Sequence, residues 1–105
     1  MIYEHRTYTV VHGEMTRYLE RYEQYALPLQ LQHLGRLLGF FVSEIGPLNQ
    51  VLHIWVFADF ADRERRRAAL DADPAWAAFK ALNVGTFVAQ EVKIMRGTQF
   101  CPQLI

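Results

Sequence analysis

The stretch GPLNQVLHIWVF, residues Gly46–Phe57, decides the fold of this chain. It begins with a turn-forming glycine and proline, and its second half alternates two kinds of side chain. Aliphatic residues stand at Leu52, Ile54 and Val56, and ring-bearing residues stand at His53, Trp55 and Phe57. Because successive side chains of a strand point to opposite faces of a sheet, this period of two predicts a strand with one aliphatic face. The other face carries an imidazole beside an indole.

Three further strands are predicted around this one. They are the segments rich in β-branched and aromatic residues at Ile2–Val11, Leu37–Ile45 and Phe87–Met95. Gly39, inside the second of these segments, indicates a bulge or a close approach of another group to the backbone.

The segment between the first two strands is predicted to be helical. Apolar residues recur there at three- and four-residue steps, and Tyr18, Tyr22 and Tyr25 are expected to contribute to the core. Pro28 is expected to kink this helix or to open a second one, and Gly35 to end it.

A second helical region follows the central strand. Asp59 is a suitable N-cap for a helix that contains Asp62–Leu70, and Asp73 followed by Pro74 predicts a new helix start. Gly85 is expected to end this helix before the last strand.

The resulting β-α-β-β-α-β order predicts an α+β fold of the ferredoxin-like type. In this fold a four-stranded antiparallel sheet carries its helices on one face, and the first strand lies between the third and the fourth. The other face is expected to be apolar, with Tyr8, Trp55, Phe57, Phe87 and Met95 on or near it. Because such a face usually marks an interface, a second copy of the chain is expected to cover it, which predicts a homodimer.

Composition narrows the possible functions and locations. The 105 residues are 51% hydrophobic and carry 11 basic and 11 acidic side chains, so no long-range attraction for nucleic acid is expected. No apolar run approaches the ~20 residues that span a membrane, and Glu4 and Arg6 interrupt the segment where a signal peptide would be apolar. The single cysteine, Cys101, excludes an intramolecular disulfide. These features predict a cytoplasmic protein.

Several motifs resemble the NIPSNAP family. They are Ile2-Tyr3-Glu4 with Arg6-Thr7-Tyr8, His33-Leu34-Gly35, Gly46-Pro-Leu-Asn-Gln50 with His53 and Trp55, and the arginine-rich helix followed by Asp73-Pro74 and Trp76. His5 stands where the family pattern has an aliphatic residue. The resemblance implies one domain over residues 1–105, with a tail at 97–105, that pairs into a dimeric α+β barrel. Members are mostly of unknown activity, and other families with this barrel include small monooxygenases and haem-degrading enzymes.

A polar cluster is the candidate catalytic site. Strands one, three and four are neighbours in the predicted sheet, so Glu4, Arg6, His53 and Glu91 could converge there. Such a cluster could hold the imidazole at a pKa near neutrality for acid–base chemistry, or bind a polar ligand. The alternative is a structural network of ion pairs that fixes the register of a dimer.

Candidate ligand-binding residues surround this cluster. A cavity between helices and sheet is expected to be lined by Tyr8, Tyr18, His53 and Trp55. His33, near the end of the first helical region, is expected to complement the helix dipole, with a clamp for a phosphate or carboxylate as the alternative.

Metal binding and nucleic-acid binding are not predicted. The four histidines lack the close spacing of metal ligands, and no cofactor motif occurs. The arginine run at residues 63–67 is interspersed with and flanked by acidic residues, which indicates a solvated helix face with ion pairs.

Two functions therefore remain open. The chain is either a binding protein or cofactor-independent, monooxygenase-like enzyme with a small apolar or aromatic ligand, or a non-catalytic homodimeric interaction module.

Overall fold

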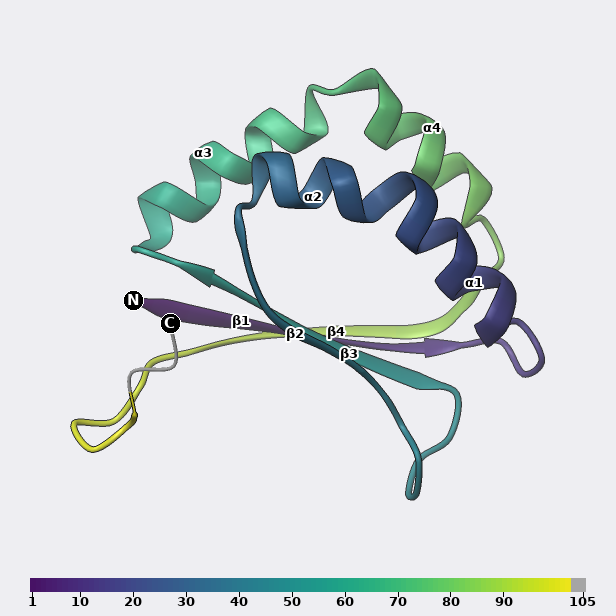
Figure 1. Cartoon of the computed structure of the whole chain (residues 1–105), viewed down its shortest axis with the longest axis horizontal. Helices are drawn as coiled ribbons and strands as arrows, with labels where there is room; N and C mark the ends of the chain where they lie inside the picture. The colour runs from purple at the N-terminus through teal and green to yellow at the C-terminus, as the bar shows by residue number, and fades with distance from the viewer. Residues whose placement is uncertain (103–105) are drawn as a thin grey trace.

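The computed structural model describes residues 1–102 of the chain. The elements follow in the order β1 (Ile2–Val10), α1 (Met15–Arg21), η1 (Tyr22–Ala26), α2 (Leu27–His33), β2 (Arg36–Val42), β3 (Gln50–Phe57), α3 (Phe60–Asp71), α4 (Pro74–Leu82) and β4 (Phe87–Met95). The four strands form one antiparallel sheet in the order β2-β3-β1-β4. All helices cover the same face of this sheet (Figure 1). The predicted ferredoxin-like α+β fold, with β1 between β3 and β4, is confirmed.

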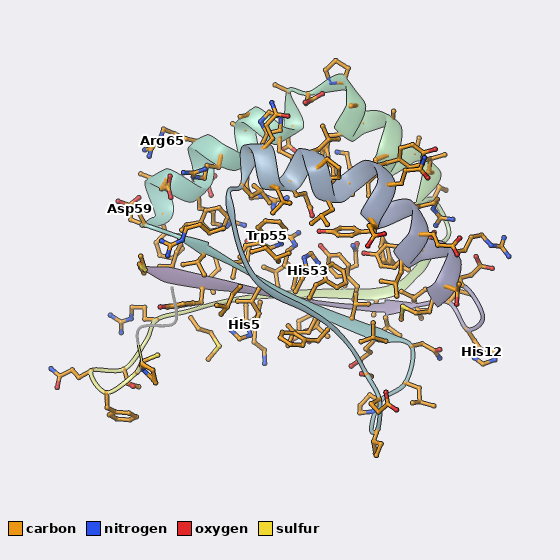
Figure 2. All side chains as sticks on the ribbon, in the orientation of Figure 1. His5, His12, His53, Trp55, Asp59 and Arg65 are labelled. Atoms are coloured by element: carbon orange, nitrogen blue, oxygen red, sulfur yellow. The ribbon has the colours of Figure 1, made fainter. Side chains whose placement is uncertain are left out.

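The strand register determines which side chains face the helices. Glu4 lies opposite Trp55, and Arg6 lies opposite His53, so these four side chains share one face. Figure 2 shows Trp55 and His53 on the helix side of the sheet and His5 on the other side.

The predicted placement of five large apolar residues on the open face is wrong for the four aromatic ones. Trp55 and Phe57 are 0% and 1% exposed, and they belong with Tyr8 and Phe87 to the core beneath the helices. The physical reason is volume, because wide rings fill the space between two layers better than the aliphatic set does. Met95, by contrast, is 49% exposed at the end of the edge strand β4.

The open face instead carries the smaller side chains of β1 and β3. Leu52 and Ile54 lie opposite Thr7 and His5 and are half-buried. Phe41, which pairs with Leu52, is 55% exposed on the same face. This face is mixed, because Thr7, Glu91 and Lys93 lie on it beside the aliphatic side chains of β3, so the predicted apolar face is found only over β3 and Phe41 of β2.

The first helical region runs through a π-helical turn, η1, between two α-helices. Pro28 has no N–H, so it cannot continue the regular ladder, and the N–H of Leu27 instead bonds to the carbonyl of Tyr22 five residues earlier. The π-helical turn has more residues than the 3.6 of an α-helix, so side chains four residues apart stay on one face of this region. The buried side chains accordingly follow steps of four: Tyr18, Tyr22, Ala26, Gln30 and Leu34. The prediction that Tyr25 belongs to the core is wrong, since it is 48% exposed.

Most predicted helix ends and the bulge are confirmed. The side chain of Asp59 accepts a hydrogen bond from the Asp62 N–H at 2.7 Å, and that of Asp73 accepts one from the Ala75 N–H at 3.0 Å. Gly35 ends α2 with φ of +86°, a left-handed conformation that glycine adopts freely. The register of β2 shifts between Leu37 and Gly39, where a bulge was expected.

The predicted second strand was too long at its C-terminal end. Residues 43–45 belong to the turn before β3, because β2 ends at Val42. The predicted tail at 97–105 lies partly outside the described residues, at 103–105. Within residues 1–102, every helix is too short or too polar to cross a membrane.

Candidate functional site

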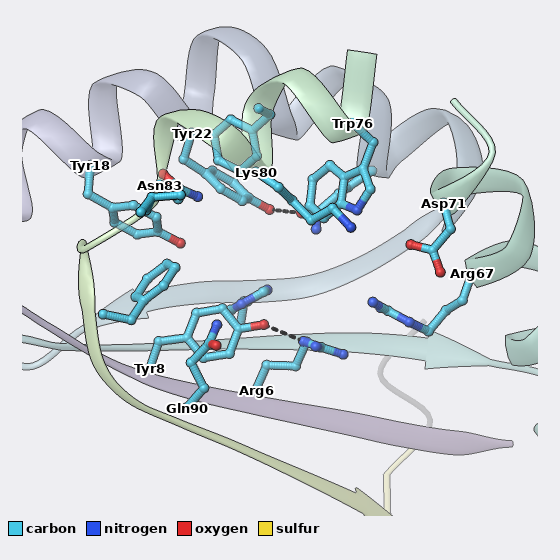
Figure 3. A pocket seen from close by; sticks show the side chains of 15 residues that line it. Arg6, Tyr8, Tyr18, Tyr22, Arg67, Asp71, Trp76, Lys80, Asn83 and Gln90 are labelled. Carbon is cyan, nitrogen blue, oxygen red and sulfur yellow. Dashed lines mark hydrogen bonds between the residues drawn. The ribbon is translucent and has the colours of Figure 1, made fainter. Parts of the chain in front are cut away.

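A cavity of about 310 Å³ lies between the covered face of the sheet and the helices (Figure 3). Six aromatic side chains form its walls: Tyr8, Tyr18, Tyr22, Trp76, Phe79 and Phe87. The remaining lining residues are, apart from Val84, polar or charged: Arg6, Gln30, His53, Arg67, Asp71, Lys80, Asn83 and Gln90. Aromatic walls are usual in small-molecule sites, and this cavity has more polar lining residues than such sites commonly have.

His53 is the most constrained polar side chain of the cavity. It is 1% exposed, and its ring stacks on Phe40 with centroids 4.7 Å apart. Its Nδ1 atom accepts a hydrogen bond of 2.8 Å from the indole N–H of Trp55. Because an indole nitrogen can only donate, Nδ1 must be unprotonated, and the proton of the neutral ring must lie on Nε2. Among the described residues, Nε2 has no hydrogen-bond partner.

The surroundings of His53 keep it neutral. Burial, together with the positive charges of Arg6 and Arg67, lowers its pKa to about 3. The expectation of an imidazole with a pKa near neutrality is therefore wrong. At neutral pH the ring offers one N–H donor and no free lone pair, so it can donate a hydrogen bond to a ligand.

A buried carboxylate holds three arginines beside the cavity. Glu4 is 0% exposed, and its Oε1 accepts a hydrogen bond of 2.7 Å from Arg63 Nε. A terminal nitrogen of Arg63 also lies 2.7 Å from Oε1. Its Oε2 lies 3.2 Å from a terminal nitrogen of Arg6 and 3.9 Å from one of Arg67. The ion pairs join β1 to α3, and they place Arg6 and Arg67 at the cavity.

The phenols of the cavity are fixed by their neighbours. The Tyr8 hydroxyl accepts a hydrogen bond of 2.6 Å from Arg6 Nε, which leaves its own proton free to be donated. The Tyr22 hydroxyl donates to the side-chain oxygen of Gln30. Burial raises the pKa of Tyr18 and of Tyr22 far above their usual range, so both hydroxyls remain protonated.

The predicted site residues fall into three groups. Arg6, Tyr8, Tyr18 and His53 line the cavity. Glu4 and Trp55 lie behind it, where each holds a lining side chain through the contacts given above.

Glu91 and His33 lie elsewhere. Glu91 pairs with Thr7 in the register, which places it on the open face, 63% exposed and 3.9 Å from the Lys93 nitrogen. The predicted convergence with Glu4 is therefore wrong, because the register of β4 on β1 gives Glu91 the opposite parity. His33 Nε2 lies 2.9 Å from the carboxylate of Asp73, so it joins the end of α2 to the start of α4.

Sequence reasoning missed several residues of the cavity. Arg67 belongs to the arginine run that was predicted to be solvated. The prediction holds for Arg65 of the same run, which points to solvent and lies 3.3 Å from Asp62. Arg63 and Arg67 turn inward to Glu4, and their four-residue spacing, which continues the face of Leu70, was a signal of this. Within residues 1–102, no three histidine, cysteine or acidic side chains are grouped so that they could hold a metal ion.

The fold and the cavity define an α+β protein of the ferredoxin-like type with a pocket between its two layers. The family model described as NIPSNAP matches residues 3–102. This chain therefore belongs to the NIPSNAP family, as its sequence motifs predicted.

Two curated relatives are longer than this chain. Protein NipSnap homolog 3A of Homo sapiens is 33% identical over 103 residues, which cover 96% of this chain and 41% of that protein. Protein NipSnap of Drosophila melanogaster is 30% identical over 101 residues, which cover 96% of this chain and 36% of that protein. The chain thus spans about two fifths of the length of these relatives.

Solved structures share the fold along nearly the whole chain. A NIPSNAP family protein with unknown function from Agrobacterium tumefaciens is 42% identical, with a TM-score of 0.93, covering 100% of this chain and 94% of that one. An antibiotic biosynthesis monooxygenase has a TM-score of 0.65 at 15% identity, covering 93% of this chain and 99% of that one. At this identity the second likeness concerns the fold alone.

Proposed function

We propose that the protein binds a small aromatic molecule in the cavity between its helices and sheet. One observation carries the proposal, namely a cavity of about 310 Å³ with aromatic walls, lined by the neutral His53, whose buried Nε2–H has no partner within residues 1–102. A buried donor without a partner costs about 1–3 kcal/mol, which a ligand that accepts its hydrogen bond would recover. A volume of about 310 Å³ and aromatic walls are found in small-molecule sites.

Binding is favoured over acid–base catalysis at this cavity. A cofactor-independent oxygenation, the reaction left open by the sequence, would need a base to remove a proton from the substrate. His53 cannot serve as that base at neutral pH, because its only lone pair accepts the Trp55 N–H. A role as hydrogen-bond donor requires no such lone pair.

Calorimetric titration with three naphthalene compounds tests the proposal. Naphthylmethanol, naphthoate and naphthylmethylammonium share one ring system, and native mass spectrometry of the purified protein would also detect a retained ligand. Val84 lines the cavity and is 85% exposed, so it stands at the rim, and Val84→Trp is expected to weaken binding. Val88→Trp is the matched control, since Val88 is 69% exposed and does not line the cavity. Binding of no probe, with no retained mass, would refute the proposal.

We further propose that two copies pair through the open face of the sheet. Phe41 is 55% exposed on this side, next to the half-buried Leu52, and Met95 is 49% exposed at the opposite edge of the sheet. The β2–β3 turn, which carries Ile45 at 93% exposure, extends beyond the sheet away from the helices (Figure 1). An apolar surface of this kind is costly to leave in water, and a second copy would cover it symmetrically.

Sedimentation velocity tests the dimer. The wild type is expected at twice the protomer mass of 12.3 kDa, and Phe41→Glu at the protomer mass. Phe60→Glu is the control, because Phe60 is 58% exposed at the start of α3, away from the open face. A monomeric wild type would refute this proposal. A dimer that binds none of the probes would instead favour the non-catalytic interaction module.

A further inference from the structure

The cavity has an uneven distribution of charge. Three of its lining side chains are cationic, Arg6, Arg67 and Lys80, and only Asp71 is anionic. Figure 3 shows the guanidinium groups of Arg6 and Arg67 pointing toward each other on the same side of the cavity. Their side chains are 15% and 21% exposed, so both charges are largely withdrawn from water.

The buried carboxylate behind these arginines does not compensate their charge fully. Oε1 of Glu4 is occupied by two contacts with Arg63 at 2.7 Å. Oε2 is shared by Arg6 at 3.2 Å and Arg67 at 3.9 Å, so Arg67 is the most loosely held of the three. Burial lowers the pKa of Arg67, and the neighbouring charge of Arg6 adds to this effect, whereas the pKa of Arg6 is raised despite its burial because of Tyr8 and Glu4. Of the two guanidinium groups, Arg67 therefore has the less favourable surroundings for its charge.

Apart from the carboxylates of Glu4 and Asp71, the polar groups named at this side are donors. Within residues 1–102 the Nε2–H of His53 has no partner, and the Tyr8 hydroxyl accepts from Arg6 and so retains a proton to donate. Together with two guanidinium groups, these donors match an ionised carboxylate, which only accepts hydrogen bonds and binds arginine strongly. An amine at the same place would meet positive charge and no acceptor among these groups.

We propose that the cavity selects aromatic carboxylates, with the carboxylate between Arg6 and Arg67 and the ring among Tyr22, Trp76 and Phe79. The inference rests on the proposed binding function and names the ligand class of the same site. The carboxylate would take the place that Glu4 leaves open at Arg67. The ring would lie against aromatic side chains of η1 and α4.

Titration with naphthoate and its neutral analogue naphthylmethanol tests the preference. The wild type is expected to bind naphthoate roughly ten- to a hundredfold more tightly than naphthylmethanol, as one charge-assisted hydrogen-bonded pair predicts. Arg67→Gln is expected to remove this preference, because it should weaken the binding of naphthoate by a larger factor than the binding of naphthylmethanol. Arg65→Gln is the matched control on the same helix, since Arg65 is 70% exposed and lies outside the cavity. Naphthylmethylammonium is expected to bind most weakly.

The outcomes separate this inference from the function on which it rests. If no probe binds, the proposed function fails. If naphthylmethanol binds as tightly as naphthoate, or if Arg65→Gln removes the preference as fully as Arg67→Gln, the function stands and the selection of carboxylates is refuted. Arg67→Lys keeps the positive charge and serves as the second variant if Arg67→Gln does not fold by circular dichroism. Arg67→Lys is expected to retain a reduced preference for naphthoate over naphthylmethanol. If Arg67→Lys abolished this preference completely, selection by charge would also be refuted.

Discussion

Replacing His53 with phenylalanine tests how the buried imidazole couples the stability of the protein to pH. The unfolded chain binds a proton at this histidine near pH 6.5, whereas the folded protein does so only near pH 3. Between these values the unfolded state holds more protons, so acid favours unfolding. The stability that depends on neutral His53 is fully present above pH 6.5 and is lost as the pH falls from there toward 3.

The size of this effect follows from the two pKa values. Lowering the pH from about 7.5 to about 5 should cost about 2 kcal/mol of unfolding free energy from His53 alone. Most carboxylates are still ionised over this range, so their contribution to the change is small. Phenylalanine keeps a ring against Phe40 but leaves the Trp55 N–H without an acceptor, which itself costs about 1–3 kcal/mol at any pH.

Urea unfolding followed by circular dichroism at both pH values measures the difference. The wild type is expected to lose about 2 kcal/mol more than His53→Phe on acidification. Trp55→Phe is the control, because it removes the hydrogen-bond donor but keeps the buried imidazole, and should retain the pH dependence. Equal losses in wild type and His53→Phe would refute the reasoning. So would an NMR titration in which the His53 ring signals shift between pH 7.5 and 5.

Three further predictions concern the ion pairs and helix caps. Glu4→Gln should lower the unfolding free energy, measured by urea unfolding, by about 3 kcal/mol, because three arginines then lose a buried charged partner. The control Glu64→Gln should change it by less than about 0.5 kcal/mol, because the Glu64 side chain is 70% exposed. Asp59→Ala should cost about 1 kcal/mol through loss of the α3 cap, and Asp59→Asn, which retains a capping oxygen, should restore most of it in the same assay. Hydrogen bonds from His33 and from a backbone N–H lower the pKa of Asp73, so the stabilisation by its carboxylate is present above the unfolded value of 3.8 and is lost as the pH falls. Asp73→Ala should therefore lower the melting temperature at neutral pH, and the difference should shrink in acid.

The order of the elements and the topology of the sheet could be predicted from sequence patterns, because periodicity, caps and turns are local. Which face the helices cover could not be predicted. The alternation at Leu52–Phe57 defines two faces but not which of them faces the helices, and the outcome depends on how the large rings of Trp55 and Phe57 fill the space beneath the helix layer. Local patterns do not contain that information.

The candidate site was predictable only in part for a related reason. Arg6 and His53 are direct neighbours across two adjacent strands, so the predicted sheet order already brought them together. The position of Glu91 depends on the register of β4, and the inward direction of Arg67 depends on how α3 is rotated over the sheet. Both the strand register and the helix rotation depend on tertiary packing, which a single sequence does not determine by its local pattern.

The place of β1 between β3 and β4 has a consequence for how the chain folds during synthesis. Ile2 pairs with Phe57, and Tyr3 pairs with Met95, so β1 must wait for segments far along the chain. Contacts of such long sequence separation slow folding, because the entropy of closing long loops is lost before the contacts form. One edge of β1 therefore stays unpaired on the ribosome until β4 has emerged. During that interval this edge is open to pairing with another nascent chain.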